Sequence, residues 1–407
     1  MPSKIQSIAI LALICSTAVF GADITISGAT RNDWKQTISL AGIRSDSSAQ
    51  SREFMDVLKN DLVRSGWFIP VNTESASVVL RGNVTSSASS ISAAVEANWL
   101  AGQRGFSWSK SASSTQTRDS AHALADQIVT RVTGKPSMAS SKILFIGKRG
   151  GAETEVFLCD ADGARVQQLT SDRKLCMSPS WVPGRNEFLY TSWLTGGAAV
   201  YKVNLDTNQR EVISSQPGVN HGAAQSTTGH IALILSRSGG VDLYVLSGGK
   251  LNRITRSKDV NESSPAWSPD GNSIVYVSDE GRIPRVYKMS VSDKQGRRLN
   301  YSSAVRESFA PEWGPLNQIA FCGRGGGRYG IYILDANADP RTSTPKLVSP
   351  NDGADYEDPS WAPDGRHIVC TRTLNYRRSL VILDTMGDPP VALHSIQGEW
   401  YLPNWSK

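Results

Sequence analysis

The chain has 407 residues, which is too long for one ordinary domain core and suits two or three domains. Apolar residues make up 39% and charged residues 20%, which excludes a disordered chain. The formal net charge is +6, and we expect it to be thinly spread because no run of five basic residues occurs. We therefore expect no nucleic-acid partner. Frequent Gly and Pro, with 11 Trp and 11 Tyr, favour β structure over a helical bundle.

Residues 1–21 are predicted to be a secretory signal peptide. Lys4 supplies the positive start, the run from Ile8 to Phe20 is apolar or small, and cleavage is expected before Ala22. The apolar run has 13 residues and about 20 are needed to span a bilayer, which disfavours a retained anchor. Cys15 raises the alternative of a lipoprotein, but such processing expects a small residue just before the cysteine and Ile14 is not small. We expect an exported protein.

Residues 22–136 are predicted to form a small α/β domain with two helices. Asp46 or Ser47 is expected to cap the first helix, and Gly66 to end it. A second helix is expected from about Asp119, with Gly134 and Pro136 stopping it. The apolar stripe of the first helix has the spacing i, i+3, i+4, i+8 and consists of Phe54, Val57, Leu58 and Leu62.

Strands of the same domain are expected at Trp67–Val71, Val78–Val84 and Ile91–Trp99. The Ser-rich stretches Thr85–Ser90 and Ser107–Thr117 are interpreted as loops. Residues 137–141 are expected to be a hinge to the next domain.

A repeat organises residues 142–407. Its motif is Pro-x-Trp, which recurs every 42 to 48 residues when one degraded copy, Ala223-Ala224-Gln225, is included. The intact copies are Pro179-Ser180-Trp181, Pro265-Ala266-Trp267, Pro311-Glu312-Trp313, Pro359-Ser360-Trp361 and Pro403-Asn404-Trp405. Each copy before the last is followed by a turn and a short apolar strand, and two further strands align after each.

Four strands per roughly 45 residues are typical of a β-propeller blade. The chain contains six aligned sets, so we predict an α/β N-terminal domain followed by an all-β six-bladed propeller. The first set lacks its opening motif, while Pro403-Asn404-Trp405 at the end of the chain is a spare one. We therefore expect the last strand to pair into the first blade and close the ring, which removes exposed sheet edges.

With these residues in place, the sequence resembles the TolB family of the Tol–Pal system over nearly the whole mature chain. The resemblance rests on the Pro-x-Trp-Ser-Pro-Asp-Gly repeats, on the turn Asp160-Ala161-Asp162-Gly163, and on the helix that precedes Ser65-Gly66-Trp67-Phe68. It implies a periplasmic, non-enzymatic scaffold that supports outer-membrane integrity and cell division. The implied partners are a Pal-like peptidoglycan-associated lipoprotein and a TolA-like inner-membrane protein. We expect a monomer that meets membranes only through these partners.

The candidate partner-binding residues lie in the loops that enter the innermost strands, because such loops ring the mouth of a propeller channel. Their varied chemistry is more than a structural repeat requires, although solvated loops are the plain alternative for each. The candidates are Asn220, His221, Asn261, Glu262, Ser263, Ser308, Phe309, Tyr356 and Glu357. The resemblance further implies that the mature N-terminus, with Asp23, Ile24, Thr25 and Ile26, contacts the TolA-like protein, although residues 22–33 are not a close match to the family.

No spacing indicates a cofactor, a metal or a catalytic triad, so none is expected. The turn at Asp160–Gly163 lacks the late carboxylate of a calcium loop and is interpreted as a hairpin turn. The string Gly325–Gly330 fits G-x-G-x-x-G but leads into a strand, which favours a blade hairpin over a nucleotide site. Pairing of Cys159 with Cys176 stays open. The alternative function is a secreted propeller that binds or hydrolyses a small molecule, peptide or glycan.

Overall fold

A computed structural model describes residues 34–99, 105–148, 153–237, 240–256, 259–393 and 398–407. The predicted signal peptide and the predicted segment Asp23–Ile26 lie outside the described residues. Residues 35–407 form one compact unit, which contains an α/β domain and a six-bladed propeller. None of the described helices is long and apolar enough to cross a membrane.

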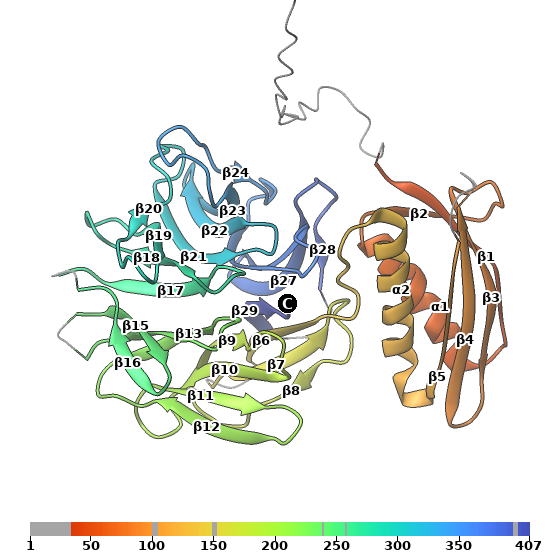
Figure 1. Ribbon diagram of the computed structural model, residues 1–407, viewed down its shortest axis with the longest axis horizontal. Helices are drawn as coiled ribbons and strands as arrows, with labels where there is room; N and C mark the ends of the chain where they lie inside the picture. Colours follow the sequence, from red (N-terminus) through yellow and green to blue (C-terminus); the bar gives the residue numbers. More distant parts are fainter. Residues whose placement is uncertain (1–33, 100–104, 149–152, 238–239, 257–258, 394–397) are drawn as a thin grey trace, which may run out of the picture. The chain divides into compact units, whose positions relative to one another are not determined.

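The α/β domain has one five-stranded sheet with the order β2-β1-β3-β4-β5 (Figure 1). Its strands are β1 (Gln36–Ser45), β2 (Phe68–Val71), β3 (Val78–Ser86), β4 (Ser90–Trp99) and β5 (Phe106–Ser113). The helices α1 (Ala49–Arg64) and α2 (Thr117–Thr133) lie on the same face of this sheet, and a short 3₁₀ turn (Ser114–Gln116) leads into α2. Both helices contribute to a single apolar cluster with the sheet.

The sequence-based prediction for the two helices is confirmed in its main points. The stripe of α1 is buried at all four predicted positions, because it faces the sheet. The cap of α1 is Ser48 and not Asp46 or Ser47; its side chain accepts a hydrogen bond from the Ser51 N–H at 3.0 Å. Asp46 instead accepts one from the Ser48 N–H and so supports the cap. Gly134 ends α2 with a left-handed φ of 68°.

Two strands of the sheet were not predicted. The stretch Ser107–Thr117, interpreted as a loop, forms β5, the 3₁₀ turn and the start of α2. β5 is an edge strand in which no residue is fully buried, and its alternating apolar residues Phe106, Trp108 and Ala112 pack only partly against the core. The serines between them favour the loop interpretation. β1 was missed as well, although it runs parallel to β2 and β3 at the centre of the sheet.

The propeller consists of six four-stranded sheets, numbered here in chain order as blades 1 to 6. Blade 1 has β29 (Glu399–Trp405), β6 (Lys142–Lys148), β7 (Glu155–Asp160) and β8 (Gln167–Gln168). Blade 2 has β9 (Cys176–Trp181), β10 (Glu187–Ser192), β11 (Ala199–Asn204) and β12 (Gln209–Ser214). Blade 3 has β13 (Asn220–Gln225), β14 (Ile231–Leu235), β15 (Asp242–Ser247) and β16 (Lys250–Arg253).

Blade 4 has β17 (Glu262–Trp267), β18 (Ser273–Ser278), β19 (Arg285–Ser290) and β20 (Arg297–Arg298). Blade 5 has β21 (Glu307–Trp313), β22 (Gln318–Gly325), β23 (Arg328–Asp335) and β24 (Lys346–Leu347). Blade 6 has β25 (Asp355–Trp361), β26 (His367–Leu374), β27 (Arg377–Asp384) and β28 (Val391–Ala392). Every strand pair within a blade is antiparallel, and the Pro-x-Trp motif ends the innermost strand of each.

The ring closes as predicted, because β29 at the end of the chain pairs with β6 in blade 1. Trp400 and Trp405 of β29 are buried in the core of that blade, and the Ser406 N–H donates to the Lys142 carbonyl at 2.8 Å. The Trp side chains of the other motifs are also mostly buried, so they belong to the cores between blades.

The expected hinge is a packed connection. Met138 lies in the core of blade 1, whereas Ala139 belongs to the apolar cluster of the α/β domain. The carboxylate of Asp126 on α2 accepts hydrogen bonds from the Ala139 and Ser140 N–H groups at 2.9 and 3.0 Å. These contacts hold both ends of the segment.

The four described cysteines are all free and buried, so Cys159 and Cys176 do not pair. Cys322 and Cys370 point to opposite faces of their own blades. Because blades 5 and 6 are neighbours, those faces meet: the Cys322 thiol contacts the Tyr356 carbonyl of blade 6, and Cys370 packs among residues of blade 5.

Candidate functional site

The antiparallel order of the strands gives each blade two distinct ends. The loops that enter the innermost strands lie at the same end as the hairpins between second and third strands; we call this end the loop face. The hairpins that follow the innermost strands lie at the opposite end, with those between third and fourth strands; we call it the turn face.

The innermost strands share a bulge that shapes the channel wall. In each of the six, the pairing register shifts in the middle of the strand. One residue at each shift has a left-handed φ between 43° and 65°, a conformation that is strained for residues other than glycine. These residues are Ser178, Gly222, Ser264, Ala310, Asp358 and Leu402. Blade 3, whose motif is degraded, places glycine at this position.

The middle residue of the Pro-x-Trp motif links neighbouring blades. The Trp181 N–H donates to the Asn404 side chain at 2.8 Å, and the Trp405 N–H donates to the Ser360 hydroxyl at 2.9 Å. The Trp361 N–H likewise donates to the Glu312 carboxylate at 2.9 Å. The motif therefore does more than fill the core, because each bond connects one innermost strand to the next.

A cavity of about 350 Å³ lies among the innermost strands, from the bulges to the turns that follow the motifs. Its polar side chains include His221, Glu312, Asp358 and Lys407. Glu312 forms an ion pair with Lys407 at 2.9 Å. Burial, followed by the charge of Glu357, raises the pKa of Asp358 to about 6, and burial lowers the pKa of His221. These shifts favour neutral groups in a desolvated channel.

The structure divides the predicted partner-binding residues into buried and accessible ones. Asn220, Glu262, Ser308 and Tyr356 are buried to at least 98% of their surface and are not available to a partner. The side chain of Asn220 bonds the Ser214 hydroxyl at 2.7 Å, and the Tyr356 hydroxyl donates to Asp352 at 2.9 Å. The accessible or half-buried residues are His221, Asn261, Ser263, Phe309 and Glu357.

Glu262 has a structural role that its sequence position does not reveal. Its carboxylate accepts a hydrogen bond from the Thr255 hydroxyl at 3.0 Å, and that hydroxyl also accepts one from the Leu243 N–H. Burial raises the pKa of Glu262 to about 7. The signal missed in the sequence is the Thr that follows the fourth strand. A Thr in the equivalent place of blade 1, Thr170, also donates to a carboxylate, although its partner Glu155 lies on the third strand of the same blade.

At the turn face, charged residues of α2 meet blade 1 in what we call the charged seam: Arg118, Asp119 and His122 of the helix with Asp160, Asp162 and Arg165 of the blade. Arg165 bonds Asp160 at 2.7 Å and also pairs with Asp119. Arg118 pairs with Asp162. The seam therefore contains three basic and three acidic residues that pair across the two domains.

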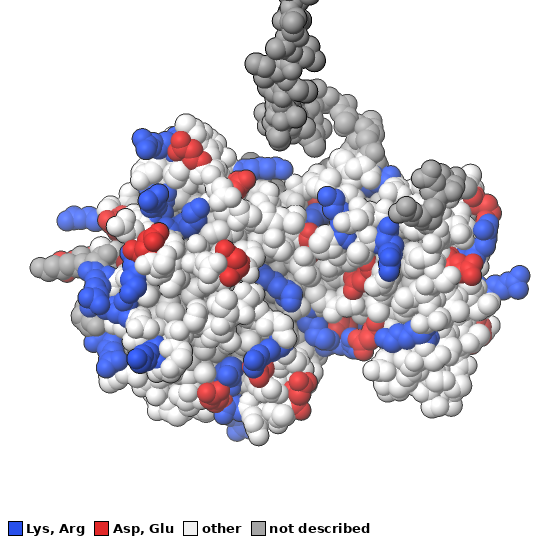
Figure 2. All heavy atoms as spheres, in the orientation of Figure 1, with Lys and Arg blue, Asp and Glu red and all other residues white. Residues whose placement is uncertain are grey.

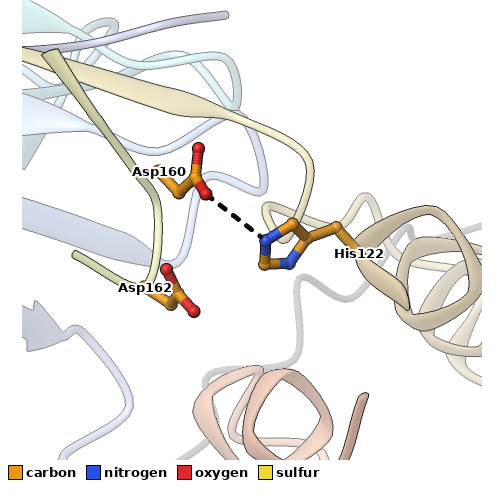
Figure 3. A group of neighbouring side chains, drawn as sticks. All are labelled: His122, Asp160 and Asp162. Carbon is orange, nitrogen blue, oxygen red and sulfur yellow. Dashed lines mark ion pairs between the residues drawn. The ribbon is translucent and has the colours of Figure 1, made fainter. Parts of the chain in front are cut away.

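His122 is the most buried member of the charged seam. It projects from α2 toward Asp160, with its Nε2 atom 3.7 Å from the carboxylate (Figure 3). Its Nδ1 atom lies 2.6 Å from Asp61 of α1. Burial disfavours the imidazolium, but the contacts with Asp160 and Asp61 outweigh it and raise the pKa of His122 to about 9.

His122, Asp160 and Asp162 have ligand atoms within 4.8 Å of one another, a spacing that could hold a metal ion. The surroundings favour ion pairing instead. Arg118 and Arg165 already neutralise the two carboxylates, and a protonated imidazole has no free lone pair for a metal. The turn itself is the predicted hairpin, with Gly163 at a φ of 86° and the Gly163 N–H donating to the Asp160 carbonyl.

A second contact between the domains involves blade 6. The Arg366 guanidinium bonds Asp384 at 2.6 Å and lies over the Trp67 ring, 4.6 Å from its centroid. Lys35, at the start of the compact unit, pairs with Asp388 at 2.7 Å. The string Gly325–Gly330 is a hairpin between β22 and β23, as predicted.

Comparison with known proteins identifies the family. A family model described as the TolB beta propeller domain, PD40, matches residues 129–407. The chain belongs to this family. The Tol-Pal system protein TolB of Bordetella pertussis is 27% identical over 294 residues, covering 71% of this chain and 65% of that protein. A protein TolB homolog of Chlorobium luteolum is 29% identical over 183 residues, covering 45% of this chain and 42% of that one. The alignments thus span less than two thirds of these relatives.

Solved structures of TolB-family proteins share the fold. TolB from Acinetobacter baumannii superposes with a TM-score of 0.80 at 23% identity, covering 92% of this chain and 97% of that one. A putative TolB from Agrobacterium tumefaciens gives a TM-score of 0.51 at 17% identity, covering 64% of this chain and 91% of that one. The order of α/β domain and six-bladed propeller is therefore an architecture of this family.

Proposed function

We propose that this protein is a periplasmic scaffold of a Tol–Pal system, which binds a Pal-like peptidoglycan-associated lipoprotein on the loop face of its propeller. The relatives named as Tol-Pal system proteins support this role. The observation that carries the position of the site is the closed ring of innermost strands, which holds accessible side chains of several chemical types at one end. A pre-formed ring loses little conformational entropy when a partner binds.

His221 and Phe309 are the anchors of the proposed site. His221 lines the channel and is neutral at physiological pH because burial lowers its pKa. Phe309 packs edge-on against Tyr329, with ring centroids 6.0 Å apart, and stays half-exposed. An aromatic ring fixed by a neighbour and an imidazole without charge are suited to a partly apolar protein interface.

A titration with the Pal-like domain from the same genome tests this proposal. The double variant His221→Ala/Phe309→Ala is expected to weaken binding by roughly 1–4 kcal/mol, the range of interface anchors. Leu316→Ala is the matched control, because Leu316 is exposed and follows the opposite end of β21, on the turn face. The control should bind like wild type. Equal affinities of the wild type and the double variant for the Pal-like domain would contradict the placement of the site on the loop face.

The proposal includes no enzymatic activity. Among the described residues, two acidic groups of the channel are engaged within the propeller: Glu312 bonds Trp361 and Lys407, and Asp358 accepts a hydrogen bond from Thr371 at 3.1 Å. The link to a TolA-like protein is assigned to the N-terminal segment. Deleting residues 22–33 should abolish binding of that protein and leave binding of the Pal-like domain unchanged.

A further inference from the structure

The net charge of the chain is concentrated in one stretch, contrary to the expectation of a thin spread. Residues 282–306 contain seven Lys or Arg and one acidic residue, Asp293, which gives +6, as much as the whole chain. Figure 2 shows Lys and Arg side chains gathered on this side of the propeller, where Figure 1 places β18, β19 and β20. The sequence hides the cluster because its members are separated by turns and apolar strand residues.

Three arginines from separate segments converge at the loop face; we call them the arginine trio. Arg285 begins β19, Arg298 ends β20 and Arg306 lies in the loop before β21. In the strand register, Arg298 lies opposite Tyr287, which is two residues along β19 from Arg285. The Ser308 N–H donates to the Pro284 carbonyl at 3.1 Å, which holds the segment after Arg306 beside the start of β19. Burial lowers the pKa of Arg285, and the charges of Arg298 and, more weakly, Arg306 act in the same direction against the nearby Glu307. Both arginines therefore lie close enough to Arg285 to repel it.

The trio has no ion-pair partner within the described part of the chain. No carboxylate oxygen there lies within 4.0 Å of a guanidinium nitrogen of Arg285, Arg298 or Arg306. In contrast, Arg253 and Arg324 on the blades to either side pair with Asp242 and Glu307. The molecule thus leaves three arginines unneutralised where their mutual repulsion is unfavourable, and an anionic partner would remove that cost.

The surroundings of the trio show which kind of anion it suits. Arg298 stacks on Tyr301 at 4.6 Å from the ring centroid, and its Nε atom is buried without a hydrogen-bond partner in the described structure. Tyr301 is 56% exposed, and Phe309 and Tyr329 follow on the same face. Arginine with Tyr and Phe is the composition of protein interfaces, and the planar guanidinium binds carboxylates through two parallel hydrogen bonds.

We propose that the arginine trio binds an acidic, Asp/Glu-rich surface of a protein partner. The choice of partner rests on the proposed function, because the trio lies at the same end of the blades as the anchors His221 and Phe309. A patch of unpaired charge beside an apolar contact accelerates association and fixes the orientation of the partner. An anionic lipid surface is the competing occupant and is an outcome of the test.

The first experiment uses a fluorescent deca-glutamate peptide as the probe at low ionic strength. The wild type should bind it, and Arg285→Ser/Arg298→Ser/Arg306→Ser should bind at least tenfold more weakly. The matched control Arg44→Ser/Arg131→Ser/Arg377→Ser removes three exposed charges elsewhere and should stay within twofold of wild type. Arg306→Ser changes only one exposed side chain of the trio, so it should report part of this loss in a variant whose fold is not at risk.

Two results would overturn the inference. One is failure of the peptide experiment: either the wild type does not bind the peptide, or the control loses as much binding as the trio variant. The other is binding to phosphatidylglycerol vesicles, sensitive to the trio, without binding to the peptide; that result would assign the surface to lipid.

The second experiment separates this inference from the proposed function. With the Pal-like domain, the trio variant should associate about tenfold more slowly at low salt and show a flatter salt dependence. An unchanged rate, with binding still sensitive to His221 and Phe309, would leave the function standing and overturn the role of the trio. Failure of the Pal-like domain to bind the wild type, while the peptide still binds, would overturn the proposed function and leave the trio as a binding site for an acidic surface.

Discussion

The two ends of the blades treat charge in opposite ways. At the turn face, Arg118 and Arg165 of the charged seam each pair with a carboxylate across the domain boundary, Arg118 with Asp162 and Arg165 with Asp119. At the loop face, the arginine trio has no such partner among the described residues, and the charges of Arg298 and Arg306 help to lower the pKa of Arg285. The difference is that the charges of the seam are neutralised within the chain, whereas in our proposal the charges of the trio are neutralised only by a partner.

This contrast separates charge that stabilises the fold from charge that serves recognition. A buried or half-buried ion pair contributes little beyond its own desolvation, but removing one member leaves a charge unpaired at high cost. An unpaired surface arginine has no such role in folding. Changes at the seam should therefore reduce stability, and changes at the trio should alter binding and barely affect stability.

Asp160→Asn is expected to have the largest effect. Asp160 is 3% exposed and contacts Arg165, Lys142 and His122, so the variant leaves the buried His122 and the partly exposed Arg165 and Lys142 without one of their carboxylate partners. We expect the free energy of unfolding to fall by about 3–5 kcal/mol, as for broken buried pairs. Urea denaturation measures it. Asp56→Asn, at an exposed position of α1, is the control and should change stability by less than about 0.5 kcal/mol. A similar small loss for Asp160→Asn would contradict the assignment of the seam as structural.

His122→Gln should give the seam a distinct pH signature. The pKa of His122 is raised to about 9 from an ordinary value of 6.5, so its contribution is complete below pH 6.5 and is lost as the pH rises through 9. The wild type should therefore exceed the variant by about 3 kcal/mol more at pH 6 than at pH 10. Unfolding curves at several pH values test this.

His221→Gln is the comparison at the loop face, and the sign of its pH dependence is reversed. Burial lowers the pKa of His221, so its neutral form is favoured in the folded state. The advantage of wild type over this variant is present above pH 6.5 and should shrink as the pH falls. If the stability difference from wild type changed with pH in the same direction for both variants, the proposed contrast between the charged seam and the loop face would be wrong.

The sequence reveals the propeller well because the features that specify it are local. The Pro-x-Trp motif, the turn after it and the apolar strand that follows lie within about a dozen residues, so each repeat could be recognised alone. Ring closure could be inferred because one motif was spare. β5 was missed because the apolar residues of its inner face, Phe106, Trp108 and Ala112, are separated by serines, and serines indicate a loop equally well.

The functional surfaces were harder to predict because they depend on contacts distant in the sequence. The burial of Glu262 depends on Thr255 at the end of the preceding blade, and the charged seam joins residues of α2 to a turn about 40 positions later. The arginine trio comes from three segments, with no basic run to mark it. A search for basic residues at the strand ends of one blade would have found it.

Arg366→Lys tests whether geometry as well as charge matters at the turn face. Arg366 bonds both oxygens of Asp384 and stacks on Trp67, and lysine keeps the charge but loses the two parallel bonds and the planar stack. We expect a loss of about 2 kcal/mol, the scale of one hydrogen bond to a charged group. Arg377→Lys, at an exposed position of blade 6, should match wild type. Equal stability of the two variants would mean that Arg366 acts only through its charge.

Arg306→Ser should have the smallest effect, with the opposite sign. Arg306 is exposed, pairs with no carboxylate in the described structure, and adds to the repulsion around Arg285. Removing it at low ionic strength should leave the free energy of unfolding unchanged or raise it by up to about 0.5 kcal/mol. Added salt should erase the gain, because a Debye length of about 10 Å at 0.1 M screens exposed charges. Thermal and urea denaturation at two salt concentrations measure this. A clear loss of stability would show that Arg306 has a partner within the fold, and the difference between the two ends of the blades would then disappear.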